Sequence, residues 1–335
     1  NVGGELNAYT TKEETFVYAA FLEEYMQRAM ELLGDMLFNS DFPQKQIDRE
    51  RDVILDEINS YLDSPSELIF DDFERLLFPN YPLGHYILGT QDSLESFDHD
   101  GLTRFVKRTY IPNQMVFFSF GKTPFNKIIR WAQKYYSFLG KSDVVNNSKP
   151  FTVNPRKVVL EKNTAQTHII MGNPVFDMFN DDCYALLLIN NLLSGGDSSR
   201  LNVALREKQG LVYNVESNVA FYTDSGIFSI YFGCDPDYAD KCVRLIEKEL
   251  RRLMNVCLTP KQLAVAKKQL CGQMGIASEN HENVALNMAK RFLHFNKYES
   301  IDEVFVRISS VTSDDIVRLT TEFLDPDKFY FLQYK

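Results

Sequence analysis

The sequence predicts an α+β protein made of two homologous domains, each an antiparallel sheet with helices packed on one side. Three observations predict this fold class. Short stretches of alternating hydrophobic and polar residues indicate strands, and longer amphipathic stretches indicate helices. The order of these elements in the first half of the chain recurs in the second half. With 335 residues, 44% of them hydrophobic, the chain is long enough to form two cores.

The first half begins with a strand pattern and continues with helix patterns. The second of these helices follows Pro43 and is expected to end before Pro65, because proline cannot continue a helix. In order, the predicted elements are a strand at 14–22, helices at 23–38, 48–61 and 102–110, and a strand at 114–121.

The second half repeats this order. Its predicted elements are a strand at 225–233, helices at 238–254, 259–274 and 313–324, and a strand at 328–334. The residues "KQI" at 45–47 match "KQL" at 261–263 at an offset of 216, which indicates one duplicated unit. The polar stretch 141–156 between the halves lacks periodicity and predicts a linker between domains 1–140 and 157–335.

Composition excludes several classes of partner. The net charge is −10 and no basic cluster is present, which argues against nucleic acid as a partner. No apolar run reaches the roughly 18 residues of a membrane span. The cysteines are odd in number and form no C-x-x-C pair, so we expect free thiols in a reducing compartment and a cytoplasmic protein. They are Cys183, Cys234, Cys242, Cys257 and Cys271.

The helix at 48–61 carries two glutamates on its apolar side. With Ile47 at zero on a helical wheel, Glu50 falls near 300° and Glu57 near 280°, inside the apolar arc that runs from Val53 near 240° to Ile58 near 20°. Carboxylates that face a core need a cation or strong donors. At the offset of 216 they correspond to Ala266 and Gln273, so the packing of the repeat does not require them.

Two interpretations of these glutamates remain open. Each could pair with an Arg or Lys in the core, or one could bind a metal ion with the other as an acidic helper. A divalent metal site needs at least three protein ligands. No pair of histidines stands at helical spacing, since the five histidines are scattered singly: His85, His99, His168, His281 and His294.

Four ordered motifs resemble those of the insulinase-like (pitrilysin, M16) zinc peptidases, including the processing-peptidase branch. They are "GGELNAYTTKEETFVY" at 3–18, "RERDVILDEI" at 49–58, "LGHYILGT" at 83–90 and "LLSGGDSSRLNVALREKQGLVYNVES" at 192–217. The resemblance runs through nearly the whole chain, and four matches in this order are highly specific.

The resemblance implies a role for each matching residue. Glu57 would be a zinc ligand and Glu50 the acidic residue that supports the site. Arg206 and Tyr213 would hold the substrate backbone and stabilise the developing oxyanion; their structural alternative is a salt bridge and a core tyrosine. The segment that would accept a peptide as an added strand consists of Leu6, Asn7, Ala8, Tyr9 and Thr10. Its alternative is an ordinary edge strand.

One family motif is absent. The H-x-x-E-H sequence supplies two histidine ligands and the general base, and the family pattern places it upstream of Asn1. Because the sequence starts within a patterned segment and without Met, we expect a trimmed form of a zinc endopeptidase that cleaves peptides in an enclosed chamber. We expect one Zn²⁺ in each intact site and none in this chain as it stands.

The family chamber is built from four domains, so two domains imply a homodimer, or a heterodimer with a related subunit. One alternative is a non-catalytic subunit that binds peptide and supplies Arg206 and Tyr213 to its partner. The other is a purely structural scaffold, which has no need of the two glutamates or of the Arg/Tyr pair.

Overall fold

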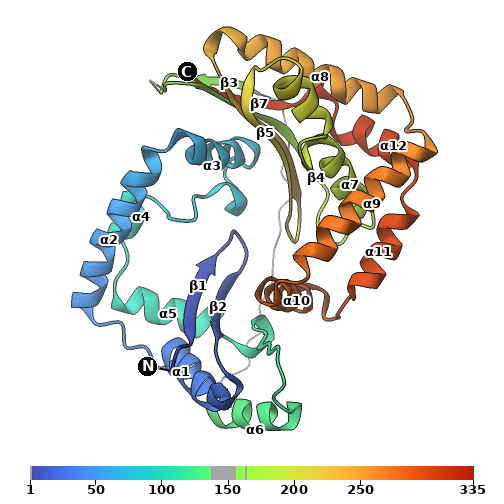
Figure 1. Cartoon of the computed structure of the whole chain (residues 1–335). Coiled ribbons are helices and arrows are strands. Elements are labelled where there is room, and N and C mark those ends of the chain that lie inside the picture. Colours follow the sequence, from blue (N-terminus) through green and yellow to red (C-terminus); the bar gives the residue numbers. More distant parts are fainter. Residues whose placement is uncertain (1, 137–155, 163) are drawn as a thin grey trace. The chain divides into compact units, whose positions relative to one another are not determined.

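The computed structural model describes residues 2–136, 156–162 and 164–335, and it has the predicted α+β class with one mixed sheet and one hairpin (Figure 1). The contacts divide the chain into two compact units. The first takes its described residues from Asn1–Ile58, Ile87–Asn147 and Ser278–Glu299, and the second from Asn59–Tyr86, Ser148–Ala277 and Ser300–Lys335. The predicted linker 141–156 lies, except for Arg156, outside the described residues. The domain boundaries therefore stay a prediction.

The first unit contains an antiparallel hairpin of β1 (Glu5–Thr10) and β2 (Thr15–Ala20). The strand predicted at 14–22 is confirmed as β2. Alternation places Tyr9 opposite Phe16 on one face, where the two rings stack with centroids 4.7 Å apart.

Helices α1 (Met26–Phe38) and α10 (His281–Phe295) contact this hairpin within the first unit. Met26 and Met30, one turn apart on α1, and Ile128 of α6 form a small core of this unit. The Tyr136 hydroxyl donates to the Met30 carbonyl at 2.8 Å. Besides α2 (Gln44–Leu62), most of which belongs to this unit, its described helices are η1 (Glu23–Tyr25), α1 (Met26–Phe38), α4 (Gln91–Glu95), α5 (His99–Thr109), η3 (Pro112–Gln114), α6 (Phe125–Tyr136) and α10 (His281–Phe295). They confirm the helices predicted at 23–38 and 102–110.

Helix α2 (Gln44–Leu62) carries the two glutamates. Arg51 links α2 to α4 and the residues just after it. Its Nε donates to the Leu94 carbonyl at 3.2 Å, and its Nη2 donates to the Phe97 carbonyl at 2.8 Å. The helix ends before Pro65, as expected. Pro65 then begins the next helix, since proline at a first helical position loses no hydrogen bond.

The second unit is built on a five-stranded sheet in the order β3–β7–β4–β6–β5. Its strands are β3 (Lys157–Leu160), β4 (Thr167–Val175), β5 (Val212–Phe221), β6 (Gly226–Cys234) and β7 (Tyr330–Tyr334). The strands predicted at 225–233 and 328–334 are confirmed as β6 and β7. The expectation of a wholly antiparallel sheet is wrong, because β3 pairs with β7 in parallel.

Helices cover both faces of this sheet, so the expectation of helices on one side is also wrong for this unit. The large core lies between the sheet and α7, α8 and α12, while Ile69 and Phe73 of α3 pack on the opposite face (Figure 1). The helices of the unit are α3 (Pro65–Leu77), η2 (Pro82–Gly84), α7 (Cys183–Ser194), η4 (Asn202–Glu207), η5 (Pro236–Tyr238), α8 (Ala239–Asn255), α9 (Pro260–Ala277), α11 (Ile301–Ser310), α12 (Ser313–Phe323) and η6 (Pro326–Lys328). The predicted helices at 238–254, 259–274 and 313–324 are confirmed as α8, α9 and α12.

The strand predicted at 114–121 is wrong for the described structure. Met115 has an extended backbone, but residues 115–120 pair with no described strand. Hydrophobic alternation predicts an extended chain, whereas a strand also requires hydrogen bonds to a neighbour. No helix in the described part of the chain is both long and apolar enough to cross a membrane.

Candidate functional site

Glu50 and Glu57 lie two turns apart on α2, and both side chains are exposed. The expectation that they face a core is therefore wrong. The helix has no buried residue, and Ile54 and Ile58 on its apolar side are half-buried. Because this apolar face is only weakly covered in the described structure, the glutamates on it remain in contact with solvent.

Neither glutamate has a structural partner in the part of the chain that the structure describes. Among the described residues, no hydrogen bond or ion pair involves Glu50 or Glu57, although Arg51 on the same helix bonds Asp48 at 3.0 Å. The interpretation that each pairs with a core Arg or Lys is thus wrong for this structure. Both carboxylates are available to a cation.

The described residues do not complete a zinc site. No group of three or more His, Cys, Asp and Glu side chains among them could hold a metal ion. Because a zinc site requires at least three protein ligands, Glu57 by itself does not fit the metal. We therefore assign no catalytic step to zinc in this structure.

Strand β1 contains the predicted peptide-binding segment, Leu6–Thr10. All six of its residues are exposed, and in the described structure it pairs with β2 alone. Its second edge is thus a row of backbone donors and acceptors that an added strand could pair with. This geometry is compatible with both the peptide-binding and the ordinary edge-strand interpretation.

Arg206 lies in an irregular helical turn. η4 is a π-helix, in which the Lys208 amide donates to the Val203 carbonyl at 3.1 Å. Such turns are rare and occur mainly at functional sites. Nη1 of Arg206 lies 3.3 Å from Oδ1 of Asp197, and both side chains are largely exposed, so this ion pair contributes little stability.

Tyr213 follows two further irregularities. Gly210 adopts the left-handed region with φ of +61°, where glycine avoids the penalty of a Cβ. The register of β5 against β6 then shifts between Val212 and Val215, so Tyr213 lies in a bulge. Its side chain is 86% exposed, so the alternative of a core tyrosine is wrong.

Two glutamines of α9 bind the glycine-rich loop that precedes Arg206. Nε2 of Gln273 donates to the Gly195 carbonyl at 2.6 Å, and Nε2 of Gln269 donates to the same oxygen at 3.0 Å. Gln273 is the repeat counterpart of Glu57 in the sequence register. At this position the second half of the chain therefore uses an amide to fix a loop.

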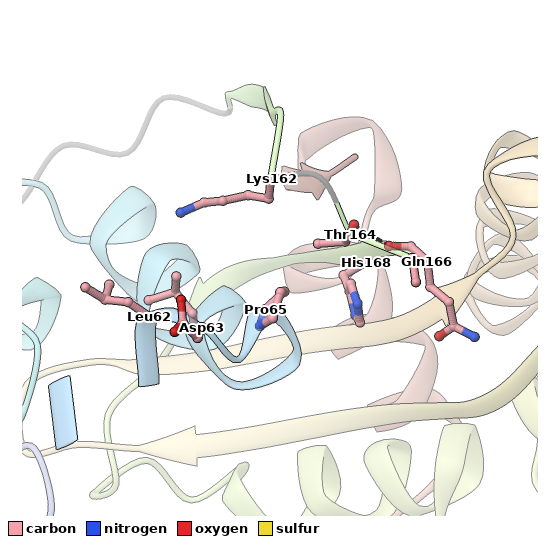
Figure 2. Close-up of a pocket in the computed structure, with 9 residues that line it drawn as sticks. Leu62, Asp63, Pro65, Lys162, Thr164, Gln166 and His168 are labelled. Atoms are coloured by element: carbon pink, nitrogen blue, oxygen red, sulfur yellow. Dashed lines mark hydrogen bonds between the residues drawn. The ribbon is translucent and has the colours of Figure 1, made fainter. Parts of the chain in front are cut away.

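A cavity of about 480 Å³ lies in the second unit (Figure 2). Leu62, Asp63 and Pro65 approach it from the α2–α3 junction, and Thr164, Gln166 and His168 from the start of β4 (Figure 2). Nδ1 of His168 lies 2.8 Å from the Tyr231 hydroxyl, and burial lowers the pKa of this histidine. No residue predicted from the sequence to be functional lines this cavity.

One polar cluster was missed at the sequence level. The buried carboxylate of Glu14 bonds to His294 and Lys290 of α10. Glu14 stands within the motif at 3–18, but its partners lie near the other end of the chain and outside every motif. The pair Lys290 and His294 at one-turn spacing was the signal that could have indicated a shared partner.

The chain belongs to peptidase family M16. The family model described as Insulinase (Peptidase family M16) matches residues 1–91, and the one described as Peptidase M16 inactive domain matches residues 96–270. These regions contain all four sequence motifs, so the resemblance inferred from them is confirmed.

Several curated relatives are named zinc proteases. The chain is 30% identical to the uncharacterized zinc protease YmxG of Bacillus subtilis, over 97% of this chain and 80% of that protein. It is 31% identical to an uncharacterized zinc protease of Rickettsia felis, over 94% of this chain and 76% of the relative.

Solved structures share the fold at low sequence identity. A protease from Helicobacter pylori matches with a TM-score of 0.88 and 19% identity, over 100% of this chain and 82% of the other. A peptidase M16 inactive domain from Pseudomonas fluorescens matches with a TM-score of 0.86 and 18% identity, over 99% and 81% of the two chains. A chain of complex III2 from Candida albicans matches with a TM-score of 0.84 and 15% identity, over 99% and 82%.

Proposed function

We propose that this chain is the peptide-holding part of a zinc endopeptidase of family M16. In this proposal Glu57 is a zinc ligand and Glu50 supports it. Strand β1 accepts the peptide through its backbone, and Arg206 and Tyr213 contact the peptide backbone near the bond that is cleaved. The zinc protease names of the curated relatives support the reaction class.

The observation that carries the proposal is the exposure of Tyr213. A tyrosine that packs in a domain hides its ring, whereas this ring is 86% exposed. The π-turn, the left-handed Gly210 and the bulge hold it there, and each interrupts regular hydrogen bonding. Local irregularity of this kind is typical of binding and catalytic sites.

Glu50 and Glu57 favour an enzyme over a scaffold. A scaffold has no need of two carboxylates at this spacing on α2, and both are exposed and without a partner within the described residues, so they can bind a cation. Zinc also needs histidine ligands and a base that the described residues do not bring to Glu57. The proposed activity therefore depends on an H-x-x-E-H segment from outside these residues.

A second candidate is a non-catalytic partner subunit, favoured by the single candidate zinc ligand in the described structure. In that case the chain binds peptide and supplies Arg206 and Tyr213 to the zinc site of another family subunit. Both candidates involve a homodimer or a heterodimer, and both give Arg206 and Tyr213 the same contact with substrate. A cytoplasmic location remains part of the proposal.

Peptide binding tests the role shared by both candidates. We expect the 335-residue chain to bind a labelled, extended peptide in a fluorescence anisotropy titration, and Arg206→Ala and Tyr213→Phe to weaken binding about tenfold, the loss of one hydrogen bond to a charged or aligned group. Tyr238→Phe is the matched control, since Tyr238 is 46% exposed and lies in η5. Equal affinities for all four proteins would exclude the assigned role of the pair.

We also propose that the two units descend from one duplicated domain. At the offset of 216, Pro65 at the start of α3 corresponds to His281 at the start of α10. Helix α3 belongs to the second unit and α10 to the first. The equivalent helix of each half thus belongs to the unit formed mainly by the other half. This symmetry supports two homologous halves.

A further inference from the structure

The carboxylate of Glu14 is buried at the turn of the β1–β2 hairpin. Its side chain is 3% exposed, and it directly precedes β2. Within the turn, the Thr11 hydroxyl donates to Oε2 of Glu14 at 2.5 Å, and the Thr11 amide donates to the Glu14 carbonyl at 2.8 Å. These bonds fix the glutamate side chain relative to the hairpin.

Helix α10 supplies the other partners of this carboxylate. Nε2 of His294 donates to Oε1 of Glu14 at 2.6 Å, and Nζ of Lys290 lies 2.9 Å from the same oxygen. Lys290 and His294 are four residues apart and so share one face of α10. The cluster joins hairpin and helix through charge-assisted hydrogen bonds, which are stronger than neutral ones.

The charged form of Glu14 is strongly favoured. Burial by itself raises the pKa of Glu14, but the hydrogen bonds from His294, Thr11 and Lys290 and the charge of Lys290 outweigh it and lower the pKa to about 2. On the strands, burial, Tyr18 and the charge of Glu14 raise the pKa of Tyr9. The carboxylate is thus ionised at neutral pH and bonded on both oxygens.

A two-stranded hairpin is only marginally stable without support. Strands β1 and β2 form the whole sheet of the first unit in the described structure, and every residue of β1 is exposed. A second contact lies at the other end of α10, where burial first and then Glu282 raise the pKa of Tyr18 on β2. Helix α10 therefore contacts the hairpin near both of its own ends.

We propose that Glu14 is a positioning residue that fastens the β1–β2 hairpin to α10 and so fixes the orientation of the peptide-accepting strand Leu6–Thr10. The effect on peptide binding rests on the proposed function of β1. The link between the hairpin and α10 rests only on the contacts of Glu14. Glu14 does not touch the peptide; it acts through the hairpin. Removing its charge loosens the hairpin while the sequence of β1 stays intact.

Hydrogen exchange and peptide binding test the proposal on the 335-residue chain. We expect Glu14→Gln and Lys290→Met each to speed amide exchange in residues 5–20 and 281–295 at least tenfold, with exchange in α8 and β6 unchanged. Peptide affinity should fall about tenfold in the same variants. Lys290→Arg keeps the positive charge and should restore both readouts. Glu24→Gln is the control, because Glu24 is an exposed glutamate of η1.

The two readouts separate this inference from the proposed function. Hairpin exchange in Glu14→Gln equal to that of the unchanged chain would overturn the positioning role, whatever the peptide does. Fast hairpin exchange with no peptide binding even by the unchanged chain would confirm the link and overturn the function of β1. Fast exchange with unchanged peptide affinity would show that the link does not position the strand, which also overturns the proposal.

Discussion

Nε2 of His294 lies 2.6 Å from Oε1 of Glu14, although 280 positions separate the two residues in the chain. This contact places α10, from the second half of the sequence, within the first unit beside the β1–β2 hairpin. The first unit therefore cannot be completed by the first half of the sequence alone. The predicted peptide-binding strand depends on a helix encoded near the other end of the chain.

The depressed pKa of Glu14 predicts how stability depends on pH. Its pKa is about 2 in the folded chain, against an ordinary value of 4.5, so its contribution is present above pH 4.5 and is lost as the pH falls toward 2. A shift of this size corresponds to about 3 kcal/mol. We expect urea unfolding of Glu14→Gln to show a deficit of that order at pH 7. The deficit should shrink between pH 4.5 and pH 2, and one that is constant over this range would contradict the account.

Substituting alanine for Gly210 and for Gly272 should change the free energy of unfolding in opposite directions. A Cβ at Gly210 or at Gly272 meets no atom within 4 Å, so only backbone preferences differ. Gly210 has φ of +61°, and alanine there should lower the unfolding free energy by about 1–2 kcal/mol. Gly272 lies within α9, and alanine there should raise it by about 0.5–1 kcal/mol. Chemical denaturation measures both, and effects of equal sign would show that Gly210 is not held left-handed.

Complementation predicts how the work is divided between subunits. In a form of the protein that carries an H-x-x-E-H segment, Tyr213→Phe should reduce turnover about 10²–10³-fold, the usual effect of losing one hydrogen-bond donor to the oxyanion. Glu57→Gln should also inactivate that form. Mixing the two should restore up to about a quarter of the activity, since half the dimers are mixed and each has one working chamber of two.

Subunit exchange must be shown in the same mixture, for example by mass spectrometry of differently labelled chains. If exchange occurs and no activity returns, Arg206 and Tyr213 do not act on the zinc site of a partner subunit. They would then act within their own chain.

Much of the fold could be predicted from the sequence, because local patterns specify local structure. The strands β2, β6 and β7 and the helices α1, α2, α5, α8, α9 and α12 lie where hydrophobic patterns and the repeat predict them. Pro65 correctly predicts the end of α2, but it also begins α3, a helix that the sequence patterns did not predict.

Contacts between distant segments could not be predicted from periodicity. A helical wheel places Glu50 and Glu57 on an arc of α2, but it does not show whether anything covers that arc, and both side chains are exposed. The Glu14–His294 contact likewise has no local signature. The exposure of Tyr213 arises from a π-turn and a bulge, which hydrophobic patterns do not reveal.

Zinc binding tests the central claim most directly. In a form of the protein that carries an H-x-x-E-H segment, zinc content and affinity should be measured for three substitutions on α2. We predict that Glu57→Gln abolishes stoichiometric zinc, that Glu50→Gln weakens it about 10–100-fold, and that Asp52→Asn, on the polar face of the same helix, leaves it unchanged. Stoichiometric zinc of undiminished affinity in all three variants would contradict the assignment of Glu57 and Glu50 to the metal site.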